Sequence, residues 1–142
     1  MVAAPRVELQ AEVDGRRADL FALVSTVEGL RRWLDEADFE PIVSKPCRFV
    51  LGDGVALGKV LAVSAPQHVS MSWDWQGEPI GTPTVVAFDL IDHGRRTHLT
   101  LRHVGLADRE QRELHEAMWR HWFGRLVAAC RTHADERSPT AL

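Results

Sequence analysis

The chain has 142 residues, a formal net charge of −3 and an apolar fraction of 45%. This length suits one domain with its own core. The acidic balance argues against a nucleic-acid partner, and no apolar run approaches the roughly 18 residues of a membrane span. Cys47 and Cys130 are too far apart to suggest a disulfide framework or a paired-cysteine zinc site. With no secretory layout at the start, the sequence predicts a soluble, cytoplasmic protein.

The N-terminal part predicts one strand followed by two short helices. Apolar and polar residues alternate from Arg6 to Val13, which is the pattern of a half-buried strand. Helical spacing then predicts a helix from Arg17 to Ser25. Ser25 followed by Glu28 resembles a capping box that opens a second helix, which should end at Leu34.

The middle of the chain predicts strands and turns only. Short β-prone runs are separated by turn signals such as Gly52-Asp53-Gly54 and Asp92-His93-Gly94. Strands so close together must form an antiparallel meander. The predicted strands are Phe39–Val43, Cys47–Leu51, Val55–Ser64, His68–Gln76, Thr84–Ile91 and Arg96–Val104.

A long helix should close the domain. Asp108 is its predicted N-cap, and its periodicity continues to about Arg131. One face should be apolar and should also carry His115; it consists of Leu114, Met118, Trp119, Trp122, Phe123, Leu126 and Cys130. Residues 1–133 are predicted to form the domain, and residues 134–142 a flexible tail.

These elements predict an α+β fold in which a curved, seven-stranded antiparallel sheet wraps around the long helix. Only that helix is large enough to cover the apolar face of the sheet. A curved sheet around one helix leaves space between them, so an internal apolar pocket is expected.

Several segments, in this order, resemble START-like domains of the SRPBCC superfamily, which have the helix-grip fold. Within it, they are most similar to bacterial homologues of the heat-shock-protein-ninety ATPase activator. The resemblance covers roughly residues 7–129 and rests on Leu23–Trp33, Gly58–Val63 with Pro66, Val69–Trp73, Thr97–Leu106, and on His115 with Trp119, Phe123 and Leu126. It implies a ligand-binding domain. The second domain and the basic–aromatic motif of the eukaryotic activator are absent, so a chaperone partner is doubtful.

Ten residues are candidates for lining a ligand pocket: Trp33, Met71, Trp73, Trp75, Phe88, His103, His115, Met118, Trp119 and Trp122. The aromatic residues and methionines could instead simply fill the core. His103 shares a face with Leu99 and Leu101, so it should point inward and approach His115. Each histidine could be a hydrogen-bonded structural group, a polar anchor for a ligand, or a general acid or base.

No cofactor, metal site or catalytic residue is predicted. His98 and His103 should face opposite sides of one strand, and His115 and His121 are six residues apart on a helix. No carboxylate pair suggests catalysis, although Glu78 should lie beside the pocket mouth.

Three functional hypotheses remain open at this stage. The first is a binding protein for a small lipophilic or aromatic molecule. The second is an enzyme of the polyketide cyclase or hydrolase type that uses the pocket histidines. The third is an interaction module, either chaperone-associated or a homodimer, which exposed Trp75 or Trp122 would favour. The fold alone does not choose among them.

Overall fold

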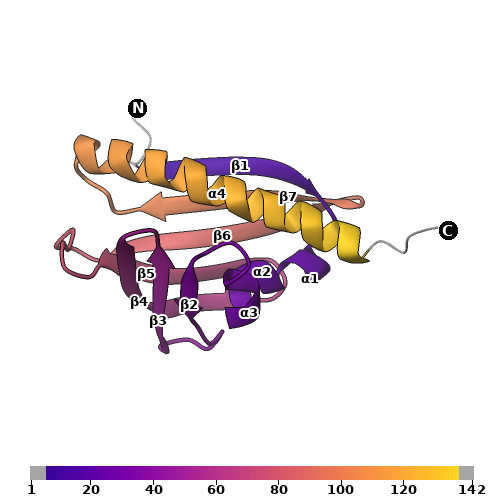
Figure 1. Cartoon of the computed structure of the whole chain (residues 1–142), viewed down its shortest axis with the longest axis horizontal. Helices are drawn as coiled ribbons and strands as arrows, with labels where there is room; N and C mark the ends of the chain where they lie inside the picture. Colours follow the sequence, from indigo (N-terminus) through magenta and orange to yellow (C-terminus); the bar gives the residue numbers. More distant parts are fainter. Residues whose placement is uncertain (1–5, 138–142) are drawn as a thin grey trace.

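The computed structural model describes residues 6–137. Its seven strands are β1 (Arg6–Asp14), β2 (Glu36–Asp38), β3 (Pro46–Leu51), β4 (Gly54–Ser64), β5 (His68–Trp75), β6 (Thr84–His93) and β7 (Arg96–Val104). Three short helices separate β1 from β2, namely α1 (Arg17–Leu20), α2 (Ala22–Ser25) and α3 (Val27–Leu30). The long helix α4 (Arg109–Arg137) follows β7 and lies along the molecule (Figure 1).

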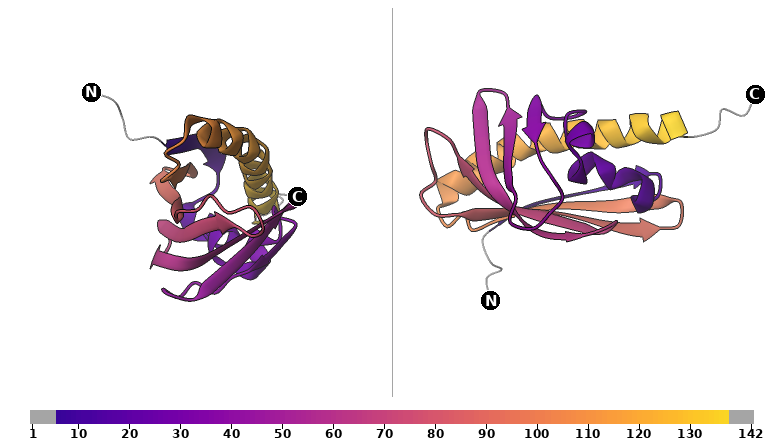
Figure 2. Two further views of the ribbon diagram at one scale, coloured as in Figure 1. Left: turned by 90° about the vertical axis from the view of Figure 1, so that its left-hand side faces the viewer. Right: turned by 90° about the horizontal axis from the view of Figure 1, so that it is seen from below.

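All strand pairs are antiparallel, and the sheet order is β1-β7-β6-β5-β4-β3-β2. After β1 the chain crosses to the opposite edge and returns strand by strand until β7 pairs with β1. The sheet curves strongly, and α4 lies along its concave side (Figure 2). The predicted α+β helix-grip fold is therefore confirmed.

The concave face of the sheet and one face of α4 form the core. Alternate residues of β7, from Thr97 to His103, are buried and lie opposite the inward residues of β1, from Val13 to Val7. From α4, the buried side chains are His115, Trp119, Trp122, Phe123, Leu126, Ala129 and Cys130. Leu114, which was predicted to join them, is 59% exposed. It belongs to the first turns of the helix, which border an open cleft.

The predicted strand Phe39–Val43 is wrong. The strand β2 lies just before it, and the chain from 39 to 45 is irregular, with Ile42 and Val43 about half exposed. Pro41 has no amide hydrogen to contribute to a strand ladder. Ser44 takes a positive φ of 76°, and its amide donates to the carbonyl of Val60, which ties the loop to β4.

The segment between β1 and β2 forms three short helices rather than the two that were predicted. The expected helix Arg17–Ser25 divides at Phe21, and the next helix is capped by Thr26 rather than Ser25. The Thr26 hydroxyl accepts from the amide of Gly29 at 3.0 Å, whereas the Ser25 hydroxyl donates to the carbonyl of Phe21. A Cβ at Gly29 would lie 1.9 Å from the carbonyl oxygen of Ala22, so only glycine permits this close approach.

The C-terminal helix is capped as predicted but is longer. Asp108 accepts from the amide of Glu110 at 3.0 Å. The helix continues past Arg131 to Arg137, so residues 134–137 of the predicted tail are helical, and the rest of that tail lies outside the described residues. Arg32, which follows α3, pairs with Glu136 at 2.9 Å and contacts His133. These contacts connect the last turns of α4 to the body of the domain.

Candidate functional site

The space between the sheet and α4 contains a cluster of aromatic rings. Trp73 is at its centre, stacked on Phe49 at 5.3 Å between ring centroids, with Trp119 at 5.2 Å and Trp75 at 5.5 Å. Six of the ten candidate residues, all buried, belong to this core: Trp33, Met71, Trp73, Phe88, Trp119 and Trp122. The structure therefore places them where sheet and helix pack together. The indole nitrogen of Trp73 is buried without a hydrogen-bond partner among the described residues.

His103 is completely buried behind this cluster, facing inward as the strand pattern predicts. Trp119 donates its indole N–H to Nδ1 of His103 at 3.0 Å. The Thr84 hydroxyl donates to the carbonyl of Trp73, so its oxygen accepts from Nε2 of His103 at 2.7 Å. Burial first, and the neighbouring His115 second, lower the pKa of His103 to about 3. His103 is thus a neutral imidazole with both nitrogens engaged.

His115, in the second turn of α4, meets the His103 ring edge to face, with 5.0 Å between the centroids. Its Nδ1 donates to the carbonyl of Gln111 at 2.7 Å, and its Nε2 accepts from the indole N–H of Trp75 at 2.9 Å. Burial lowers the pKa of His115, and the hydrogen bond to Gln111 opposes that shift. The Trp75–His115 pair thus joins the end of β5 to the start of α4.

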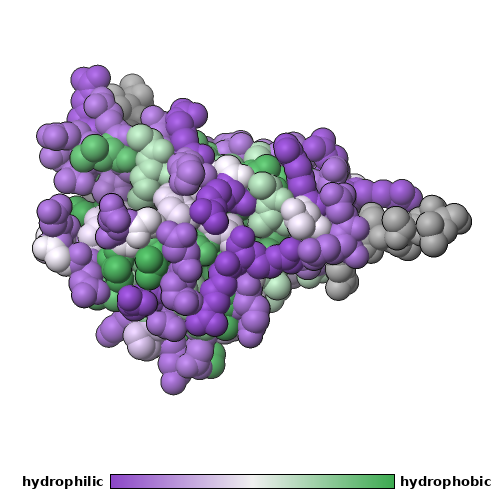
Figure 3. Space-filling model, viewed as in Figure 1, coloured by the Kyte–Doolittle hydropathy of each residue, from purple (hydrophilic) through white to green (hydrophobic). Residues whose placement is uncertain are grey.

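An open cleft of about 650 Å³ lies on the solvent side of this pair. The β3–β4 turn, the end of β5, the loop before β6 and the first turns of α4 form its walls. Figure 3 shows hydrophobic surface beside the N-terminal half of α4, interrupted by hydrophilic side chains. The lining residues are Leu51, Asp53, Gly54, Trp75, Gln76, Glu78, Ile80, Gln111, Leu114, His115 and Met118.

Three of the predicted site residues, Trp75, His115 and Met118, line this cleft, and His103 lies directly behind His115. Glu78 also borders this open cleft, whereas the sequence placed it beside the mouth of an internal pocket. The β3–β4 turn and Gln111 were missed, because strand and helix periodicity do not tell which loops meet at one end of a curved sheet. Leu114, which the sequence placed on the core-facing side of α4, instead lines this cleft.

Among the described residues, two charged side chains line the cleft, and both are acidic. Asp53 comes from the β3–β4 turn and Glu78 from the loop after β5. Apolar groups from Leu51, Ile80 and Met118 lie among the polar groups. Such a mixture of apolar walls and a few polar groups is typical of small-molecule sites, and the volume lies in their usual range.

Comparison with known proteins identifies the family. A family profile described as "Activator of Hsp90 ATPase homolog 1-like protein" matches residues 14–131, which is most of the chain. The chain belongs to this family. The match confirms the START-like resemblance seen in the sequence, and no curated protein matches the chain.

Solved structures agree with this assignment at the level of the fold. A Mesorhizobium loti protein has a TM-score of 0.80 at 21% identity, over 95% of this chain and 100% of its own. The AHSA1 protein of Silicibacter pomeroyi scores 0.71 at 25% identity, over 87% of this chain and 96% of its own. The Aha1 dimer from Colwellia psychrerythraea scores 0.75 at 16% identity, over 91% and 98%. Within residues 6–137, no helix is long and apolar enough to cross a membrane.

Proposed function

We propose that the chain is a binding protein for a small organic molecule with an aromatic or aliphatic body, which it holds in the cleft beside Trp75 and His115. The observation that carries this proposal is the cleft itself, with an indole, a thioether and aliphatic groups on its walls. Membership of an SRPBCC-type family supports ligand binding in general. The proposed ligand occupies this open cleft rather than a cavity inside the aromatic core.

The charge of the cleft indicates which ligand charges it can accept. Asp53 and Glu78 supply negative charge, and none of the lysines and arginines whose side chains the structure describes lines the cleft. An anionic ligand would meet like charges, whereas a neutral or cationic polar group would be accepted. Gln76 and Gln111 add amide groups that can donate to or accept from a ligand's hydroxyl or carbonyl.

The state of the two histidines supports binding over the cyclase- or hydrolase-type alternative. A general base must reach the proton that it removes. His103 is fully buried, and its nitrogens are held by Trp119 and Thr84. His115 borders the cleft, but its nitrogens are held by Trp75 and Gln111. We therefore assign both a structural role, with the Trp75–His115 pair as a preformed wall.

Fluorescence titration with Nile red, a neutral lipophilic dye, tests the proposal. The wild-type chain should give saturable emission at one dye per chain. Leu114→Arg places a bulky cation in the cleft and should weaken binding at least about tenfold. Leu61→Arg, at an exposed leucine of β4 outside the cleft, should bind like the wild type. Equal effects of the two substitutions, or no saturable binding, would contradict the proposal.

A homodimer is a second candidate property. The Colwellia relative is described as a dimer, and this chain exposes Leu57 and Leu61 on β4, each more than 40% accessible. Exposed apolar side chains on one strand are a common feature of interfaces. Sedimentation equilibrium of the wild type and of Leu57→Arg decides the matter: a dimer that the substitution dissociates supports it, and a wild-type monomer rules it out.

We also propose a cytoplasmic location. Both cysteines are free and buried, a state expected of a reducing compartment. Labelling of the tagged chain in fractionated cells tests this directly.

A further inference from the structure

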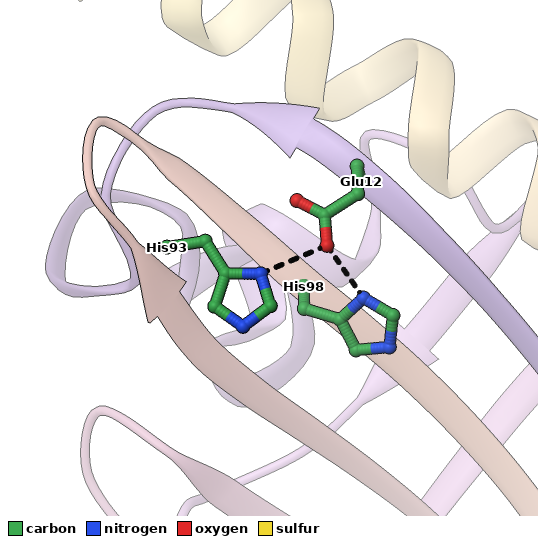
Figure 4. Close-up of side chains that lie close together, drawn as sticks. All are labelled: Glu12, His93 and His98. Carbon is green, nitrogen blue, oxygen red and sulfur yellow. Dashed lines mark hydrogen bonds and ion pairs between the residues drawn. The ribbon is translucent and has the colours of Figure 1, made fainter.

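A second cluster of chemically active side chains lies on the convex face of the sheet, away from the cleft. His93 ends β6, His98 lies on β7 and Glu12 on β1 (Figure 4). In the strand register, Glu12 is directly opposite His98, and His93 is opposite Arg96. Since residues two apart on a strand share a face, His98 lies on the same face as His93. The tight β6–β7 turn thus brings two imidazoles and one carboxylate together.

The three side chains converge on one oxygen atom. Oε1 of Glu12 lies 2.7 Å from Nδ1 of His98 and 3.0 Å from Nδ1 of His93. The imidazole rings are stacked, 5.6 Å apart and inclined by 30°. One ligand atom from each residue lies within 4.8 Å of the others. Figure 4 shows both rings directing a nitrogen towards the carboxylate.

The neighbouring hydrogen bonds engage the other nitrogen of His98. The amide nitrogen of Gln10 donates to Glu8 at 2.8 Å, which fixes the orientation of that amide. Its oxygen then faces Nε2 of His98 at 3.1 Å. Both nitrogens of His98 therefore face oxygen acceptors, and a neutral imidazole has only one N–H to offer. With the N–H of Nε2 directed to Gln10, Nδ1 presents its lone pair on the side of Glu12.

We propose that Glu12, His93 and His98 form a binding site for a divalent transition-metal ion of the zinc class. Two imidazole nitrogens and one carboxylate oxygen are a ligand set that Zn²⁺ accepts, at metal–ligand distances of about 2.0–2.2 Å. Ligands around a tetrahedral ion at such distances are roughly 3.4 Å apart. Small rotations of these side chains, none of which is buried, would open the present contacts to that spacing. Water would complete the coordination.

The side chains next to the three ligands are compatible with a bound metal ion. Gln10 accepts from Nε2 of His98, which leaves the lone pair of Nδ1 for the metal; such an outer hydrogen bond is usual for a metal-bound histidine. Arg96 is the nearby cation, and its guanidinium pairs with Asp14 at 3.3 Å and with the main-chain carbonyl of Glu12 at 3.3 Å. Its charge is thus partly neutralised by a carboxylate that the site does not use.

Sequence reasoning missed this site because it compared His98 only with His103 on the same strand. The pair His93 and His98 is separated by a hairpin turn, and the third ligand is 81 residues from His93. Only the pairing of β1 with β7 brings Glu12 to the two histidines.

Calorimetric titration of the chelator-treated chain with Zn²⁺ tests the proposal. One Zn²⁺ per chain should bind at pH 7.5. His93→Gln, His98→Gln and Glu12→Gln should each weaken binding at least about tenfold, as expected when a metal ligand is lost. None of the three side chains is buried, with 56% of His93, 37% of Glu12 and 26% of His98 accessible, so the variants should melt like the wild type without metal.

His68→Gln is the matched control. His68 also contacts a carboxylate, Asp89 at 2.8 Å, but no second histidine shares that contact among the described residues. This variant should bind Zn²⁺ like the wild type. Absence of Zn²⁺ binding would overturn the proposal. Binding that survives His98→Gln unchanged would also overturn it, because the ion would then lie elsewhere.

Discussion

The buried histidine of β7 predicts a specific acid sensitivity of folding. The pKa of His103 is about 3 in the folded chain, against an ordinary value of 6.5. Between these two values the unfolded chain binds one proton more than the folded chain. The free energy of unfolding therefore falls as the pH is lowered. The full stabilisation that the folded state gains from a neutral His103 is present only above about pH 6.5.

The size of this effect follows from the shift. One pH unit corresponds to about 1.4 kcal/mol for one extra proton. Lowering the pH from 7.5 to 4.5 should thus cost about 2–3 kcal/mol through His103 alone, a large part of the roughly 5–15 kcal/mol that stabilises a domain. His115 shifts in the same direction and adds to the slope.

His103→Gln isolates the effect. A glutamine amide can donate to Thr84 and accept from Trp119, but it does not titrate in this range. Urea unfolding at several pH values should show a shallower pH dependence for the variant than for the wild type, by close to one proton near pH 5. In the wild type, the His103 ring signals should not titrate down to pH 4.5. Parallel pH profiles, or a His103 that titrates near 6.5, would refute the reasoning.

Three other predictions concern packing and the cleft wall. Gly29→Ala should destabilise the chain by at least about 2 kcal/mol through the clash with Ala22. Gly124→Ala, at an open position of α4, should instead stabilise it by about 0.5–1 kcal/mol. Thermal or chemical unfolding measures both changes, and equal effects of the two substitutions would contradict this packing. Burial raises the pKa of Cys47 to about 11 and that of Cys130 to about 12, so Ellman's reagent should label both only after unfolding, and rapid labelling of the native chain would be inconsistent with the structure. Trp75→Phe removes the donor to Nε2 of His115, which should raise the pKa of His115 towards its ordinary value in an NMR titration and cost about 1 kcal/mol of stability; an unchanged pKa would argue against that hydrogen bond.

Much of the fold follows from local sequence patterns. The alternation in β7 predicted both its limits and the inward direction of His103, because one face of a curved sheet must be buried. The segment after β2 was mistaken for a strand, since Ile42 and Val43 are β-prone although they lie in an exposed loop. Strand propensity alone does not show whether a segment has a partner strand.

The candidate site was predictable only in part. The sequence correctly predicted that His103 and His115 lie close together, because both belong to apolar faces that pack against each other. It could not show that the large aromatic rings pack against one another in the core, since this depends on how closely α4 approaches the sheet. The cleft was found only from the structure, because it forms where turns and loops from distant parts of the chain meet the first turns of α4.

The most direct test of the central claim is a titration followed through the five tryptophan indole N–H signals by NMR. The probes are 2-naphthol, 1-naphthylmethylamine and 2-naphthoate, which share one ring system and differ in charge. The account predicts that the Trp75 signal shifts first and saturably, since this is the indole that lines the cleft, and that naphthoate binds most weakly beside Asp53 and Glu78. Shifts confined to the other four indoles, or no saturable shift with any probe, would contradict it.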